Sequence, residues 1–149
     1  MARVPQPRRA HRQRLTPLDP LCLLVAGVVR ATLPAPEFTL AWRHSVEKTR
    51  WEEHYRVQGD ELLLAEARVE GTGAGMEPPP EAVFRGGWWT WQPRRTVADL
   101  MLARSSATSD YVLCWRDRCS DLGAIIGSAP DNSPVTIAAC ASTTAAPSR

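Results

Sequence analysis

The stretch FTLAWRHSVEKTRWEEHYRV, residues 38–57, alternates apolar and polar side chains along most of its length. Successive side chains of an extended chain point to opposite faces, so a period of two is typical of a β-strand with one buried face. One face of the first half carries Phe38, Leu40 and Trp42, and residues 48–50 connect it to a second strand. The corresponding positions of the second strand are Trp51, Glu53, Tyr55 and Val57. The stretch therefore predicts two adjacent antiparallel strands.

The rest of the chain continues this pattern in short segments. Gln58–Gly59–Asp60 is a turn sequence, and the strand pattern ELLLAEARV, residues 61–69, follows it. Other apolar segments, separated by turn residues, predict strands at 21–29, 87–91, 100–105, 110–115 and 134–140. A brief helical turn is expected near residues 121–126. The sequence predicts an all-β fold, a small antiparallel β-sandwich or barrel-like domain of about seven or eight short strands.

The two ends of the chain differ from this middle part. Residues 1–20 have almost no large apolar side chain, so we expect a disordered basic leader. Residues 141–149 are small and polar, so we expect a disordered tail and a single β domain at residues 21–140. The apolar run 21–29 has two interpretations, a buried strand, which we favour, or the apolar region of a signal peptide. It is too short to span a bilayer, so we expect no transmembrane segment.

The distribution of charge argues against a nucleic-acid binder. The chain has 149 residues and a formal net charge of +2, and the first 20 residues hold five Arg and one Asp. The remaining chain therefore has 13 basic and 15 acidic residues, which gives no basic surface for a phosphate backbone. We expect no nucleic-acid partner, and the sequence leaves the oligomeric state open.

The four cysteines restrict which strands can be neighbours, if they form disulfides. Cys114 and Cys119 flank a four-residue segment, and a tight hairpin there brings their Cα atoms to the ~5.5–6 Å that a disulfide needs. That pairing leaves Cys22 for Cys140, which requires the first and last strands to be neighbours. A zinc site is a weak alternative because the usual ligand spacings are absent, and we expect no metal. Reduced core cysteines in a cytosolic protein are the other alternative to disulfides in an oxidising compartment.

The densest group of polar side chains is HSVEKTRWEEHY, residues 44–55. His44 and Ser45 are neighbours on an alternating strand and point to opposite faces, which argues against a base–nucleophile pair. We expect His44 to meet Glu52 or Glu53 across the hairpin instead. The glycine-rich loop at 71–76 lacks a phosphate-binding pattern and suits close approach to this strand end. We predict a polar patch for binding or local structure, without catalytic residues or a cofactor, that comprises His44, Ser45, Glu47, Glu53, Tyr55, Gly73 and Gly75.

The tryptophans have two interpretations as well. Trp88, Trp89, Trp91 and Trp115 either fill the core or line a ligand or partner surface. Alternation lets only one of Trp88 and Trp89 face inward, so we expect at least one of them on the surface.

Three segments carry a resemblance to one family, and they are FTLAWRHSVEKTRWEEHYRV, GTGAGMEPP and LCWRDRC. Over about residues 21–140 the chain is similar to the domain of unknown function 1850 family (DUF1850), a set of small bacterial proteins. The resemblance implies a compact β domain. It also implies frequent encoding beside the permease and binding protein of a tripartite ATP-independent periplasmic (TRAP) transporter of the TAXI type. It implies no activity.

Two classes of function follow from these observations. The first is a non-enzymatic accessory or interaction domain whose partners are membrane transporter subunits. The second is a small hydrolase or ligand-binding protein that uses His44 and nearby carboxylates. The family resemblance and the cysteines favour the periplasm or cell envelope, whereas the lack of a clear signal peptide favours the cytoplasm.

Overall fold

The all-β prediction is confirmed by the structure, a computed structural model that describes residues 19–43, 49–71, 78–128 and 131–144. Twelve strands and two short helices lie within these ranges. The first strands are β1 (Leu21–Val25), β2 (Val28–Leu33), β3 (Glu37–Arg43), β4 (Arg50–Gln58), β5 (Glu61–Glu70) and β6 (Val83–Arg85). The remaining elements are β7 (Trp88–Trp91), β8 (Arg95–Val97), β9 (Leu100–Leu102), β10 (Val112–Trp115), β11 (Arg118–Asp121), α1 (Leu122–Ile126), β12 (Val135–Ala139) and α2 (Cys140–Thr144).

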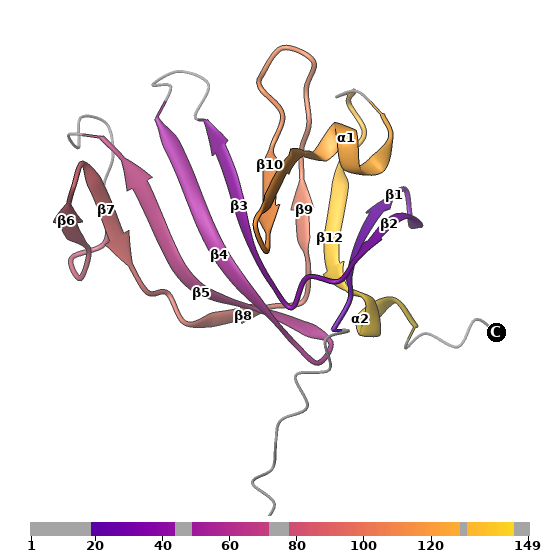
Figure 1. Cartoon of the computed structure of the whole chain (residues 1–149), viewed down its shortest axis with the longest axis horizontal. Coiled ribbons are helices and arrows are strands. Elements are labelled where there is room, and N and C mark those ends of the chain that lie inside the picture. Colours follow the sequence, from indigo (N-terminus) through magenta and orange to yellow (C-terminus); the bar gives the residue numbers. More distant parts are fainter. Residues whose placement is uncertain (1–18, 44–48, 72–77, 129–130, 145–149) are drawn as a thin grey trace, which may run out of the picture.

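The strands form two antiparallel sheets (Figure 1). The large sheet has the order β11-β10-β3-β4-β5-β7-β6, and β8 also pairs with β5. The small sheet has the order β2-β1-β12-β9. β8 and β9 are consecutive strands that belong to different sheets, so the chain passes from the large sheet to the small sheet between Val97 and Leu100. The arrangement is a barrel-like sandwich, as expected from the many short strands.

Alternation on both sheets produces one apolar core. The large sheet contributes the buried residues Phe38, Leu40, Tyr55, Val57, Leu62, Leu64 and Leu113. The small sheet contributes Leu21, Leu23, Val135, Ile137 and Ala139. Burying each large aliphatic or aromatic side chain stabilises the fold by about 1.5–3 kcal/mol. We call the face of the large sheet that carries these residues the inner face, and the opposite face the outer face.

The elements differ from the predicted ones mainly in number. The predicted strand at 21–29 is two strands, β1 and β2, joined by a turn at Ala26 and Gly27 with φ of 50° and 76°. β6 and β8 have only three residues each and were not expected. The expected helical turn is α1, and residues 141–144 of the predicted tail belong to α2. No helix in the described ranges is long and apolar enough to cross a membrane.

Both expected cysteine pairings are present as disulfides. Cys114 and Cys119 lie directly opposite each other in the β10–β11 hairpin, with Cα atoms 4.0 Å apart. Cys22 of β1 is bonded to Cys140, with Cα atoms 5.0 Å apart. β1 pairs with β12 along its whole length, which makes the ends of the described domain neighbours. Cys140 is the first residue of α2 and not the last residue of the strand.

Candidate functional site

Two residues of the predicted polar patch, Glu53 and Tyr55, are described by the structure and are in contact. Both lie on the inner face of β4, and the Tyr55 hydroxyl donates a hydrogen bond of 3.1 Å to Glu53 Oε1. The Tyr55 ring is buried and stacks on Phe38, with ring centroids 5.2 Å apart. The other members of the patch lie outside the described residues, and they are His44, Ser45, Glu47, Gly73 and Gly75.

The register of the β3–β4 hairpin contradicts the expected pairing of His44 with a glutamate. Glu53 lies opposite Leu40, and Glu52 lies opposite Ala41. The last described pair of this ladder is Arg43 and Arg50, and His44 itself lies outside the described residues. The cross-strand partner of Glu53 is therefore four positions before His44 in the sequence. Cross-strand pairing therefore cannot bring His44 to either glutamate.

A row of aromatic rings lies on the inner face beyond the core. Trp42 and Trp51 are cross-strand partners and stack with ring centroids 6.2 Å apart. Trp42 also contacts Tyr111 at 6.1 Å, and Trp51 meets the edge of Trp91 at 6.4 Å. All four side chains are half-buried. We call Tyr111, Trp42, Trp51 and Trp91 the aromatic row, which extends from the residue before β10 across β3 and β4 to β7.

Glu53 lies on the same face as this row, and its surroundings change its proton affinity. Burial raises the pKa of Glu53, although the Tyr55 hydrogen bond and the charge of Arg95 act in the opposite direction. Burial, together with the charge and hydrogen bond of Glu53, raises the pKa of Tyr55 well above its usual value. The pKa of Tyr111 is also raised, by burial and by the charges of Asp110 and Glu53. Glu53 is therefore a partly desolvated carboxyl group beside aromatic rings.

Three buried polar atoms of the described residues lack a hydrogen-bond partner, and all are at one end of the large sheet. They are Thr49 Oγ1, Trp51 Nε1 and Trp89 Nε1. Trp51 and Trp89 both pair with Val69 of β5, one from each side. A buried donor without an acceptor destabilises a protein by ~1–3 kcal/mol. A bound group with acceptor atoms would remove this penalty at the aromatic row.

The outer face carries charged side chains instead. Glu52 accepts hydrogen bonds from Arg50 at 3.0 Å and from Arg68 at 2.8 Å. The Arg68 guanidinium lies 4.0 Å from the centroid of the Trp88 ring. His54 Nδ1 is 3.1 Å from Thr39 Oγ1, next to a shallow hollow of about 190 Å³. These contacts are typical of a solvated sheet face.

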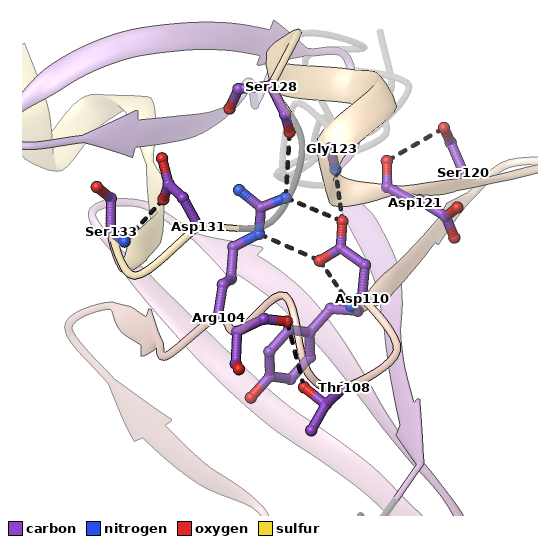
Figure 2. A network of polar contacts seen from close by, with 11 residues as sticks. Arg104, Thr108, Asp110, Ser120, Asp121, Gly123, Ser128, Asp131 and Ser133 are labelled. Carbon is purple, nitrogen blue, oxygen red and sulfur yellow. Dashed lines mark hydrogen bonds and ion pairs between the residues drawn. The ribbon is translucent and has the colours of Figure 1, made fainter.

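A second polar cluster, which the sequence did not reveal, holds the β9–β10 connection against α1 (Figure 2). Arg104 Nε and Nη2 donate to the two carboxylate oxygens of Asp110 at 3.1 and 3.0 Å. Arg104 Nη2 also donates to the Ser128 carbonyl oxygen, and the backbone N–H groups of Tyr111 and Gly123 donate to Asp110. Both carboxylate oxygens of Asp110 thus accept two hydrogen bonds each, so the cluster stabilises the loop and positions Tyr111.

The sequence of this chain matches one known family. A model of the family described as domain of unknown function (DUF1850) matches residues 38–122. The chain belongs to this family. No curated protein and no solved structure matches it.

The DUF1850 match contains the whole candidate site. It runs from β3 to the first residue of α1 and includes the aromatic row, Glu53, Tyr55 and the pair of Arg104 and Asp110. β1, β2 and β12, together with the disulfide between Cys22 and Cys140, lie outside the match. The matched part of the chain therefore holds the strands of the large sheet, with its aromatic inner face, and β9 of the small sheet.

Proposed function

We propose that this chain is a non-enzymatic accessory domain that interacts with the subunits of a TAXI-type TRAP transporter. The observation that carries the proposal is the aromatic row beside Glu53 on the inner face. Tryptophan and tyrosine side chains supply large contact areas at protein interfaces and account for many of their energetically dominant residues. Membership of the DUF1850 family supports the choice of a transporter as the partner.

The proposed location is the periplasm or the cell envelope. Disulfides form and persist in oxidising compartments and are rare in the cytosol. All four cysteines lie in the two disulfides, which supports a location where both bonds are maintained. A transporter of this type presents its substrate-binding partner in the periplasm, so this location suits an accessory domain.

The chemistry of the site also favours recognition over bond-breaking. A tyrosine acts as a nucleophile or base only when its hydroxyl loses a proton easily, and the raised pKa of Tyr55 opposes that loss. Glu53 accepts a hydrogen bond from the Tyr55 hydroxyl and is half-buried beside aromatic rings. Such a carboxyl group suits a partner or ligand that supplies hydrogen-bond donors or a positive charge.

One observation supports the alternative class, a ligand-binding protein or small hydrolase. A carboxyl group with a pKa raised by burial is the kind of group that serves as a general acid or base in catalysis. The alternative predicts turnover of an ester, phosphoester or peptide substrate that is lost in His44→Ala or Glu53→Gln. We expect no such turnover in the wild-type chain.

The experiment that tests the interaction uses two tryptophans of one strand. Trp91 lies in the aromatic row, whereas Trp88, three residues earlier on β7, contacts Arg68 on the outer face. We expect the tagged chain to co-purify in detergent with the co-expressed permease and binding protein. Trp91→Ala should weaken binding of the permease about thirtyfold or more and reduce its recovery accordingly, because aromatic interface residues contribute ~2 kcal/mol or more. Trp88→Ala should leave recovery unchanged.

Circular dichroism of each variant shows whether the fold survives. The proposal fails if the wild-type chain recovers neither transporter subunit, or if the two tryptophan variants reduce recovery equally while both remain folded. Turnover that depends on His44 or Glu53 would replace it with the alternative class.

A further inference from the structure

β6 is a free edge of the large sheet. It pairs with β7 on one side and ends the strand order of the described residues (Figure 1). All three of its residues are exposed, and the exposed fractions are 56% for Val83 and 48% for Phe84. A free edge presents unpaired backbone groups to other chains, and soluble proteins usually protect such an edge with charges or a covering segment. Exposed apolar residues on this edge indicate a surface for strand addition.

The β6–β7 hairpin determines which backbone groups face outward. Arg85 and Trp88 are cross-strand partners joined by Gly86 and Gly87, whose φ angles are 62° and 87°. In a two-residue hairpin of this kind the residues that flank the turn form a hydrogen-bonded pair. The N–H and C=O groups of Phe84, the next residue back along β6, therefore point to the free edge. The C=O of Ala82 points the same way, while the Ala82 N–H donates to the Pro79 carbonyl oxygen at 2.9 Å.

The sequence of this edge, EAVFR at residues 81–85, is complementary to itself in the antiparallel direction. When two copies are aligned about Val83, Glu81 of one copy lies opposite Arg85 of the other. The same alignment sets the small Ala82 opposite the large Phe84 and brings the Phe84 N–H to the Ala82 C=O of the second copy. Opposite charges and complementary sizes at cross-strand positions stabilise a pair of strands.

A groove beside this edge is lined by the same charged and apolar side chains. Its volume is about 580 Å³. Val83 and Arg85 of β6 line it, together with Glu81, which lies two residues before β6. Its lining also includes Thr90, Trp91, Gln92 and Arg94 of the neighbouring segment. Glu81, Val83 and Arg85 are the alternate positions that a second copy would contact in the alignment about Val83. Pairing would therefore bury Val83 between two ion pairs.

We propose that two copies of this chain associate through antiparallel pairing of their β6 edges, with Glu81–Arg85 ion pairs on both sides of Val83. The pairing makes one continuous sheet from two large sheets and removes both free β6 edges. This interface consists of one short strand from each copy, so we expect it to bury less than the ~1,200 Å² of a stable interface. We therefore expect a weak dimer, with a dissociation constant of roughly tens of micromolar.

Sedimentation equilibrium of the full chain, from ~5 to ~500 µM, tests this pairing. We expect a dimer that is populated at high concentration. Glu81→Arg and Arg85→Glu should each weaken self-association about tenfold or more, because each places like charges opposite each other. An equal mixture of the two variants should associate again, because each copy then supplies the charges that the other requires. Arg30→Glu, an equal charge change on the exposed part of β2, should leave self-association unchanged.

The mixture also serves as a test of folding, since only folded copies present the β6 edge. A chain that stays monomeric across the concentration range overturns the proposal. So does a dimer that both single variants leave intact, because another face must then form it. Variants that fail to associate when mixed, while their circular dichroism matches the wild type, contradict the proposed register.

Discussion

Arg104 and Asp110 show how much one residue pair can contribute when both partners are buried. Their side chains are only 2% and 9% exposed, and the carboxylate also accepts two backbone N–H groups. Arg56 and Glu37 form an ion pair of similar length, 3.2 Å, but both side chains are more than half exposed. Water screens the second pair and replaces its hydrogen bonds when one partner is lost. The two pairs should therefore respond differently to the same substitution.

We predict that Arg104→Met destabilises the chain by about 3–5 kcal/mol, because it leaves Asp110 buried without its counter-charge. Arg56→Met should change the free energy of unfolding by less than about 1 kcal/mol. Urea unfolding monitored by tryptophan fluorescence measures both values. Equal effects of the two substitutions would show that Asp110 finds a replacement partner or becomes solvated.

The raised pKa of Glu53 predicts that the stability of the chain depends on pH. Burial raises its pKa, so the folded state holds this proton to a higher pH than the unfolded state does. Between the two pKa values the folded state binds more protons, and the contribution of Glu53 to stability falls as the pH rises. Glu53→Gln, which keeps an acceptor for the Tyr55 hydroxyl, should therefore gain stability relative to the wild type as the pH rises from about 4 to 7.

Urea unfolding of both proteins over that pH range measures the difference. Glu61→Gln, at an exposed position of β5, controls for the change in net charge. A Glu53→Gln variant that loses stability relative to the wild type as the pH rises would mean that the carboxylate has a stabilising partner in the folded state.

At the scale of the elements, strands with clear alternation and short turns could be predicted from the sequence. The β10–β11 hairpin followed directly from the close spacing of Cys114 and Cys119. The register of the β3–β4 hairpin did not follow, because alternation gives the face of each side chain and leaves the cross-strand partners open. β6 and β8 were missed because three residues are too few to show a period. Alternation therefore identified faces correctly but could not set the register of this hairpin.

The β4–β5 hairpin joins the two longest strands through one of the tightest turns, and Gly59 permits it. Gly59 has a φ of 62°, and a Cβ atom at this position would meet no atom within 4 Å. We predict that Gly59→Ala destabilises the chain by about 1–2 kcal/mol through backbone strain alone. Gly59→Asn should cost less, because asparagine adopts positive φ more readily than alanine. Thermal unfolding followed by circular dichroism compares them, and an alanine variant as stable as the wild type would show that the turn can change type.

For the whole molecule, the sequence could indicate that the chain ends meet but not how the sheets divide. The cysteine count suggested that Cys22 and Cys140 are neighbours, and the pairing of β1 with β12 places them together. The assignment of β8 and β9 to different sheets depends on contacts between distant segments, which local patterns do not contain. For the same reason, the aromatic row could not be foreseen as a unit, since its four rings come from separate strands and a loop.

The two disulfides close loops of very different length and should contribute unequally to stability. Cys22 and Cys140 are 118 residues apart, whereas Cys114 and Cys119 are five residues apart. A cross-link stabilises a protein mainly by restricting the unfolded chain, and the restriction grows with loop length. We predict that Cys22→Ala with Cys140→Ala lowers the free energy of unfolding by about 4–5 kcal/mol, and that Cys114→Ala with Cys119→Ala lowers it by about 2 kcal/mol. Urea unfolding of both double variants and of the oxidised wild type measures this ranking. A smaller loss at the 22–140 pair than at the 114–119 pair would mean that the ladder between β1 and β12 persists in the unfolded state.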